Sequence, residues 1–220
     1  MSKAPVGRTV DRFLEVLAVI LLGIATVGTA WCGLQSSLWS GESDRIANVA
    51  AEERADANRL FGLASTEMSY DATIVASYAQ AVASGNHDPQ QFYRTTLVRK
   101  GFLRYLDAWE AQIKAGQTPQ NLLDDKAYTD EMLGPYRAAQ AQADLDAKAG
   151  ENAGRWGDLY VLSTVLLAVS LFFAGVTASF RAPSLRMALM VACMVTIAIS
   201  AVRLGDLPVA PSTWALATSR

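Results

Sequence analysis

The sequence predicts an all-α membrane protein, with three transmembrane helices and an extracytoplasmic α-helical bundle inserted between the first and the second. Three uncharged segments carry this prediction: residues 16–34, 159–180 and 187–202. An α-helix rises 1.5 Å per residue, so about 20 apolar residues cross the roughly 30 Å hydrocarbon core of a bilayer. Most charged residues lie between the first two segments, and that stretch is therefore expected outside the membrane.

Residues 1–12 are expected to be a cytoplasmic N-terminus, and residues 13–39 the first transmembrane helix. A cleaved signal peptide is the alternative, because Gly28 and Ala30 have the spacing of a cleavage site. Trp31 before Cys32 does not fit a lipoprotein signal. We therefore interpret this segment as an uncleaved anchor.

Basic residues near the ends of the apolar segments predict the orientation of the chain. One set would share a side of the membrane: Lys3, Arg8, Arg12, Arg181 and Arg186, against Arg45, Arg155 and Arg203 on the other side. The positive-inside rule then makes the loop at 181–186 cytoplasmic. Residues 40–156 form the extracytoplasmic domain, 157–180 and 187–204 the second and third transmembrane helices, and 205–220 an extracytoplasmic tail. The expected location is the bacterial inner membrane.

The third transmembrane segment is short, since the uncharged residues 187–202 cover only about 24 Å. Arg186 and Arg203 are therefore expected to extend toward the membrane surfaces. Pro208 and Pro211 should prevent a longer helix. The apolar residues of the tail are expected to lie along the outer interface: Leu204, Leu207, Val209 and Trp214.

Helical periodicity organises the segment outside the membrane. Apolar residues recur at helical spacings from Ile46 to Val82, which predicts one long helix that stops near Gly85. Asp88-Pro89 is typical of a helix start and predicts a second helix as far as Gly116.

A third, shorter helical segment at 122–133 is expected to break or kink at Gly134-Pro135. An alanine-rich helix follows from Tyr136 into the second transmembrane segment. No segment shows the alternation of a β-strand, so no strand is predicted.

The second outer helix carries three neighbouring basic residues that are candidates for contact with a partner: Arg99, Lys100 and Arg104. If the first two outer helices form an antiparallel hairpin about Asn86, this basic set lies beside Glu67 and Asp71. Two alternatives stay open. The set can pair locally with Asp107 and Glu110, or it can bind an acidic partner or a lipid head group.

Two segments resemble an uncharacterised family of bacterial three-span inner-membrane proteins: WCGLQSSLWSG at 31–41 and NAGRWGDLYVLSTVLLAVSLFFAG at 152–175. The likeness covers the end of the first transmembrane segment and the start of the second. It implies the three-span topology with an extracytoplasmic helical domain, and it implies no activity.

The reactive side chains do not favour catalysis, so the chain is expected to be non-enzymatic, with no catalytic residue, cofactor or metal. His87, the only histidine, lies beside Asp88 in a predicted turn, where capping fits better than acid–base chemistry. The methionines at 187, 190 and 194 are interpreted as packing residues rather than haem ligands. Cys32 and Cys193 are expected at different membrane depths, too far apart for a disulfide. A net charge of −2 argues against binding of nucleic acid.

A transport function finds little support, because the three apolar segments contain no ionisable side chain. A channel would have to be a homo-oligomer lined by hydroxyl side chains: Thr26, Thr29, Ser163, Thr164, Ser170, Thr196 and Ser200. The alternative is that these hydroxyls bond to carbonyl groups of their own helix or a neighbour. A homo-oligomeric channel is the second functional hypothesis.

Small residues at four-residue spacings let helix backbones approach closely, and they favour an interaction function. The candidate helix-packing residues lie on all three segments: Ala25, Thr29 and Gly33; Ser170, Ala174 and Ala178; Ala188, Ala192, Thr196 and Ser200. The three segments can bury these rows of small residues by packing on one another. A row that is not used in this way would face a second copy or a partner subunit. The first hypothesis is therefore a non-enzymatic interaction or accessory subunit. Its expected partners are membrane lipid and either itself or another membrane or envelope protein.

Overall fold

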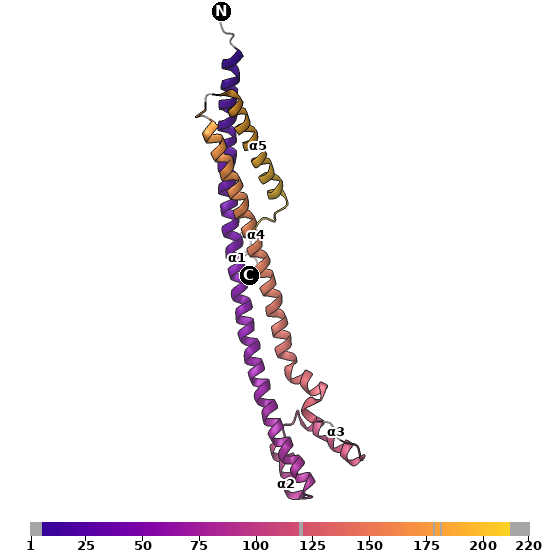
Figure 1. Ribbon diagram of the computed structural model, residues 1–220. Helices are drawn as coiled ribbons and strands as arrows, with labels where there is room; N and C mark the ends of the chain where they lie inside the picture. The colour runs from indigo at the N-terminus through magenta and orange to yellow at the C-terminus, as the bar shows by residue number, and fades with distance from the viewer. Residues whose placement is uncertain (1–5, 119–120, 178, 181, 212–220) are drawn as a thin grey trace, which may run out of the picture. The chain divides into compact units, whose positions relative to one another are not determined.

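The computed structural model describes residues 6–118, 121–177, 179–180 and 182–211. These described residues form helices joined by turns, with no β-strand among them (Figure 1). Three of the helices are long and apolar enough to cross a membrane. The prediction of an all-α chain with three membrane-length helices is thus confirmed at this level.

The helices follow one another as α1 (Val6–Ala83), α2 (His87–Phe92), the π-helical turn η1 (Tyr93–Leu97), α3 (Leu103–Lys114), the 3-10 turn η2 (Leu122–Asp124), α4 (Lys126–Thr177) and α5 (Pro183–Gly205). Two compact units share α1 and α4. Unit 1 contains Met1–Ala47 and Ala147–Arg220, and unit 2 contains Asn48–Asp146.

Glycine ends two of the helices where the sequence predicts it. Gly85 follows α1 with φ of 68°, and Gly116 follows α3 with φ of 69°. Glycine adopts this left-handed conformation without the steric penalty that a Cβ atom would bring.

The prediction of one continuous helix from Asp88 to Gly116 is wrong. The first part begins at His87 with Asn86 as its N-cap. The π-helical turn η1 ends at Leu97, and the backbone of the next residue, Val98, is extended (φ −68°, ψ 125°). The chain then turns before α3 begins at Leu103. This interruption lets Phe102, which is 2 % exposed, enter the core of unit 2, and such burial outweighs the lost helical hydrogen bonds.

Of the break or kink expected at Gly134-Pro135, the break is absent, because α4 continues from Lys126 through Pro135 to Thr177. Proline inside a helix removes one hydrogen bond and costs about 3 kcal/mol. Contacts on both sides of it offset this cost. Tyr128 is buried in the core of unit 2, and the Tyr136 ring lies 5.2 Å from the ring of Phe61.

In unit 1, α1, α4 and α5 pack side by side around two clusters of buried side chains. Leu21, Ala174, Met190 and Cys193 form one cluster. Cys32, Tyr160 and Leu167 form the other. Helix α5 begins at Pro183, earlier than the expected third transmembrane segment, and proline in the first helical turn is well tolerated there.

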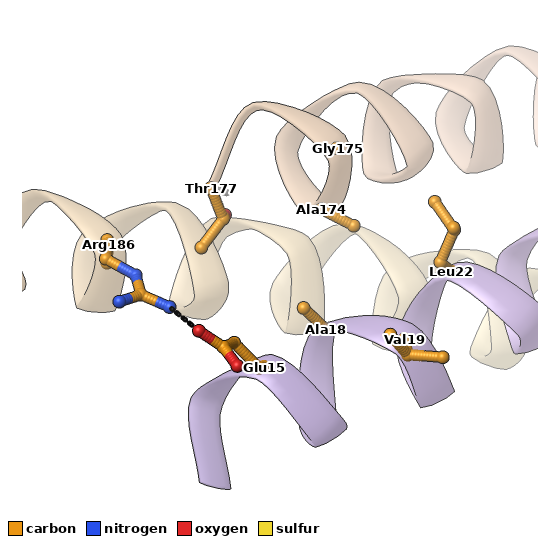
Figure 2. A pocket seen from close by; sticks show the side chains of 8 residues that line it. All are labelled: Glu15, Ala18, Val19, Leu22, Ala174, Gly175, Thr177 and Arg186. Carbon is orange, nitrogen blue, oxygen red and sulfur yellow. Dashed lines mark ion pairs between the residues drawn. The ribbon is translucent and has the colours of Figure 1, made fainter. Parts of the chain in front are cut away.

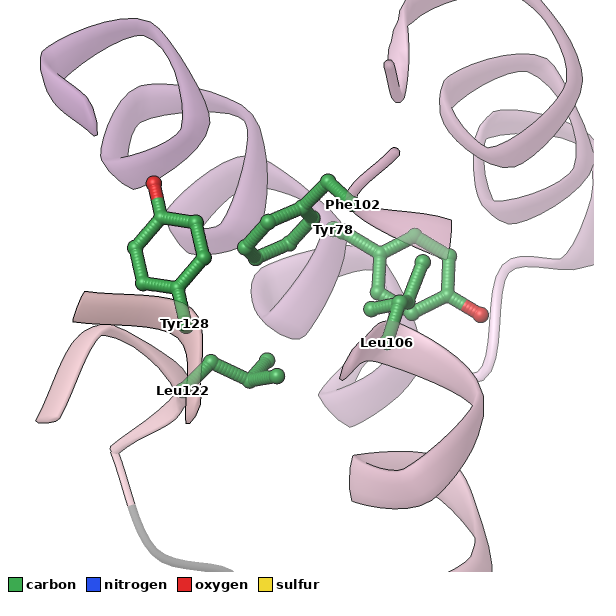
Figure 3. Close-up of a cluster of buried hydrophobic side chains, with 5 residues drawn as sticks. All are labelled: Tyr78, Phe102, Leu106, Leu122 and Tyr128. Atoms are coloured by element: carbon green, nitrogen blue, oxygen red, sulfur yellow. The ribbon is translucent and has the colours of Figure 1, made fainter. Parts of the chain in front are cut away.

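In unit 2, aromatic and leucine side chains from α1, α3 with its N-cap residue, η2 and α4 form a small core (Figure 3). Its buried members are Tyr78, Phe102, Leu106, Leu122 and Tyr128. The rings of Phe102 and Tyr128 meet edge to face, with centroids 5.2 Å apart. Aromatic pairs in this geometry stabilise a core beyond the burial of their area.

Candidate functional site

Helix α1 packs on α4 in unit 1 through small residues. A Cβ atom on Gly28 would lie 3.0 Å from Leu167 Cδ1, and one on Gly157 would lie 3.4 Å from Ser40 Oγ. Ser43 Oγ donates a hydrogen bond to the Gly150 carbonyl at 2.9 Å. These glycines allow the two backbones to approach closely, as small residues do between helices.

The candidate packing residues divide into three groups. Four are buried in unit 1: Ala25, Ser170, Ala174 and Ser200. Three are half-buried: Thr29, Ala192 and Thr196. Gly33 and Ala188 are exposed, and Ala178 lies outside the described residues. The helices of unit 1 therefore satisfy most of these positions among themselves and leave Gly33 and Ala188 facing outward.

Gly33 belongs to a row of exposed small residues on α1, here called the small-residue face: Gly23, Thr26, Ala30, Gly33 and Ser37. At 3.6 residues per turn, these positions fall within an arc of about 80°. A Cβ atom on Gly23 or Gly33 would meet nothing within 4 Å. Larger exposed side chains, including Val16, Val27 and Leu34, occupy the neighbouring arc. Four-residue spacing alone identified only Gly33 of this face.

The hydroxyl groups proposed to line a channel all donate to a carbonyl oxygen four residues earlier in their own helix: Thr26, Thr29, Ser163, Thr164, Ser170, Thr196 and Ser200. Ser170 and Thr196 also lie 2.7 Å apart, oxygen to oxygen, and join α4 to α5. The structure therefore agrees with the alternative to a channel lining, in which these hydroxyls bond to carbonyl groups of their own helix or a neighbouring helix.

The segment after α5 folds back onto α1 and α4 within unit 1. Trp39 Nε1 and the Tyr160 hydroxyl donate to the Pro208 carbonyl at 3.0 and 3.2 Å. The backbone N–H of Ala210 donates to Gln35 Oε1 at 2.8 Å. The helix stops at Gly205, in agreement with the prediction of a non-helical tail. Trp214, also expected in this tail contact, lies outside the described residues.

A cavity of about 390 Å³, here called the Arg186 cavity, lies between the N-terminal parts of α1 and α5 and the C-terminal part of α4 (Figure 2). Its walls are mostly apolar: Ala18, Val19, Leu22, Ala174 and Gly175, with the Thr177 side chain. Arg186 and Glu15 point toward each other at one end, with Nη2 and Oε1 4.0 Å apart. The Arg186 side chain is only 13 % exposed, whereas Glu15 is 67 % exposed. The Arg186 side chain thus lies against the helices. The sequence had predicted instead that it extends toward the membrane surface.

In unit 2, a buried carboxylate joins α1 to the turn before α3 and to α4. Asp71 is 2 % exposed and accepts two hydrogen bonds from Arg99, at 3.0 Å from Nε and 2.5 Å from Nη2. The Tyr128 hydroxyl donates to the same carboxylate at 2.8 Å. Arg99 also pairs with Glu67 at 2.6 Å. The predicted placement of Arg99 beside Glu67 and Asp71 is confirmed.

The pKa values of this cluster reflect its contacts. Hydrogen bonding to Asp71 raises the pKa of Arg99, so the guanidinium stays charged. Burial, reinforced by the negative charge of Asp71, raises the pKa of Tyr128. Both groups therefore keep the hydrogens that bind Asp71 throughout the physiological pH range.

A second polar cluster is centred on Arg94, which the sequence pattern does not mark as a partner of Asp107 and Glu110. Arg94 pairs with Asp107 and, at 2.7 Å, with Glu110. Glu110 also accepts from the Tyr78 hydroxyl at 2.5 Å. Burial, followed by the contact with Glu110, raises the pKa of Tyr78 to about 12. The local carboxylates suggested as partners for Arg99 thus bind a different arginine.

The other two candidate partner-contact residues differ from Arg99. Arg104 pairs with Glu131 of α4 instead of the predicted α1 carboxylates, and its guanidinium lies 4.9 Å from the Tyr105 ring. Lys100 is exposed. The basic set is therefore divided between intramolecular ion pairs and solvent.

Two acidic residues face each other where α1 meets α4 in unit 2. Burial and the neighbouring carboxylate of Asp146 raise the pKa of Glu53. Glu53 Oε2 is buried without a hydrogen-bond partner. A raised pKa in the folded state means that the folded state binds this proton more tightly than the unfolded state does.

The Glu53→Gln variant is therefore expected to be more stable than the unmodified protein at pH 7. The advantage should shrink as the pH falls through the raised pKa toward the ordinary value of about 4.3, because protonation then relieves the same repulsion. Thermal unfolding of the full-length protein at pH 7 and pH 5 measures this difference. Glu52→Gln is the matched control, since Glu52 is exposed, and an equal shift in both variants would contradict the expectation.

The other chemically reactive groups form no centre within the part of the chain that the structure describes. No group of three or more His, Cys, Asp or Glu residues there could hold a metal ion. Cys32 and Cys193 are free thiols that lie in separate buried clusters. His87 is exposed at the start of α2.

Comparison with family models, curated proteins and solved structures gives no match for this chain.

Proposed function

We propose that this protein is a non-enzymatic membrane subunit that binds a helix of another membrane protein, or of a second copy, through the small-residue face of α1. The observation that carries the proposal is the open space over Gly23 and Gly33 on an exposed apolar helix. The helices of unit 1 do not use this face, although they pack closely through Gly28 and Gly157.

The separation of small and large side chains on α1 supports a protein contact there. Apolar burial does not drive helices together in a bilayer, because lipid tails are as apolar as leucine. Close backbone approach does, and it requires small side chains such as Gly23, Ala30 and Gly33. The neighbouring arc of Val16, Val27 and Leu34 suits contact with lipid.

A homo-oligomeric channel is the weaker alternative. Its lining would consist of hydroxyl groups, and each of these already donates to a carbonyl of its own helix. A hydroxyl has a single O–H, so these groups have no donor left for an anion or for water in a pore. The interaction proposal needs no polar lining.

The proposed location is a bacterial inner membrane, with the N-terminus in the cytoplasm and unit 2 outside. The distribution of arginine and lysine around the apolar segments supports this orientation. In intact cells, a membrane-impermeant thiol reagent should label Gly85→Cys and spare Ser184→Cys. The opposite pattern would reverse the orientation.

The Gly33→Leu variant tests the proposed contact. A leucine there would hold the partner backbone away, and overpacking of this kind costs about 1–3 kcal/mol, or about 5- to 150-fold in affinity. Energy transfer between donor- and acceptor-labelled copies in liposomes measures self-association, and quantitative co-purification from membranes measures a different partner. We expect a loss in one of these two measurements.

The control is Val27→Leu, which enlarges a side chain on the lipid-facing arc of the same helix. It should leave both measurements unchanged. Because Gly33 has open space around it, the substitution does not disturb unit 1 itself. Unaltered association in Gly33→Leu and in Ala30→Leu would refute the proposal.

A further inference from the structure

The Arg186 cavity combines apolar walls with one guanidinium group. We infer that it binds an anionic phospholipid of the surrounding bilayer, with an acyl chain along its walls and the phosphate group on Arg186. The inference rests on insertion of α1, α4 and α5 into a bilayer. It goes beyond the proposed partner contact, because the cavity involves α1 only as far as Leu22, before the small-residue face begins at Gly23.

The walls fit a hydrocarbon chain. Val19 and Leu22 supply apolar surface from α1, while Ala174 and Gly175 of α4 are small and so leave the space open (Figure 2). A Cβ atom on Gly175 would meet nothing within 4 Å. A volume of about 390 Å³ is in the range of ligand-binding pockets. In a bilayer, the molecules adjacent to such a cavity are lipids, and their acyl chains match its apolar surface.

The charged end of the cavity fits a phosphate group. A guanidinium presents paired N–H donors that match two phosphate oxygens, typically at about 2.7–2.9 Å. The existing ion pair with Glu15 is long, at 4.0 Å, and Glu15 is mostly exposed. At 4.0 Å the two groups are too far apart for a hydrogen bond, so a phosphate within hydrogen-bond distance of the guanidinium can compete with the Glu15 carboxylate.

The sequence just before the first and third apolar segments favours an anionic head group over a zwitterionic one. The N-terminal segment contributes Lys3, Arg8 and Arg12, and the loop before α5 contributes Arg181, against Asp11. Each basic residue near a membrane surface adds roughly fivefold to the preference for anionic lipid. Arg186 then determines where the head group binds.

Native mass spectrometry of the full-length, detergent-purified protein tests this inference. The probes are dioleoyl phosphatidylglycerol and dioleoyl phosphatidylcholine, titrated separately. We expect the unmodified protein to bind the anionic lipid at least fivefold more tightly than the zwitterionic lipid. In Arg186→Gln, the ratio of the two affinities should fall by about fivefold. Equal binding of the two lipids by the unmodified protein would overturn the inference.

Glu15→Gln separates a lipid site from a purely structural ion pair. Removing the competing carboxylate should strengthen phosphatidylglycerol binding, whereas Arg186→Gln should weaken it. A structural pair would be lost in both variants, so effects in the same direction would contradict the inference. Because Glu15 is largely exposed, its replacement does not endanger folding.

Two further comparisons locate the acyl chain. Gly175→Leu fills the cavity and should weaken binding of both lipids, while Gly33→Leu on the small-residue face should weaken neither. Inorganic phosphate should fail to displace phosphatidylglycerol, since it lacks the chain. Unchanged lipid binding by Gly175→Leu, or displacement by phosphate alone, would exclude the proposed mode of binding.

Discussion

Replacement of Asp71 by alanine is expected to destabilise unit 2 by about 3 kcal/mol. The substitution leaves the Arg99 guanidinium and the Tyr128 hydroxyl without the carboxylate that both now bind. Removing one partner of a buried ion pair costs about 3–5 kcal/mol, because the other charge stays in a poorly solvated place. Arg99 is 32 % exposed, so water recovers part of its solvation and the lower end of that range applies.

Hydrogen exchange of the full-length protein, followed by mass spectrometry, measures this loss in peptides from residues 67–83 and 103–114. Glu67→Ala is the matched control, since Glu67 binds the same arginine but is 49 % exposed. An exposed pair contributes about 0–1 kcal/mol. Equal losses in Asp71→Ala and Glu67→Ala would show that burial of Asp71 does not determine its contribution.

Local signals in the sequence predicted the helix ends of unit 2 better than its interior. Gly85 and Gly116 end their helices because a left-handed residue is a property of the local backbone. The break before Phe102 depends on contacts with α1 and α4, so the local pattern did not indicate it. The neighbouring Gly101 is the one local feature that indicates a break in the helix at this point. Pro135 is the converse case, since packing on both sides keeps the helix intact.

A four-residue spacing predicts only part of the packing face of α1. Residues four apart are rotated by about 40° at each step, so a row from Ala25 to Gly33 moves about 80° around the helix. Alternating steps of three and four stay on one face. The structure follows that rule with Ala25, Gly28 and Cys32, and Gly33 falls on the exposed side.

The cavity and the tail contact could not be predicted from the sequence. Arg186 was expected to extend outward because the third apolar segment is short, whereas its distance to Glu15 depends on how α1 and α5 pack. The hydrogen bond from Ala210 to Gln35 joins residues 175 positions apart. The residue pattern within one segment does not indicate which distant residues it will contact.

The Gly157→Leu variant is expected to destabilise unit 1 by about 3 kcal/mol. A Cβ atom at this position would already lie 3.4 Å from Ser40 Oγ and 3.5 Å from the Ser36 carbonyl and Trp39 Cβ. The Ser36 carbonyl belongs to the backbone of α1, so a leucine side chain can fit only if α4 moves away from α1. That movement opens the cluster of Cys32 and Tyr160 one turn farther along α4.

The rate at which a thiol reagent modifies the buried Cys32 reports this opening. Gly41→Leu is the control, because its Cβ atom would meet nothing within 4 Å. Leucine there is expected to stabilise the helix by up to about 1 kcal/mol, since glycine is a poor helix former. Opposite effects of the same substitution would show that close contact, and not helix propensity, requires glycine at position 157. Faster modification of Cys32 in both variants, or in neither, would contradict this explanation.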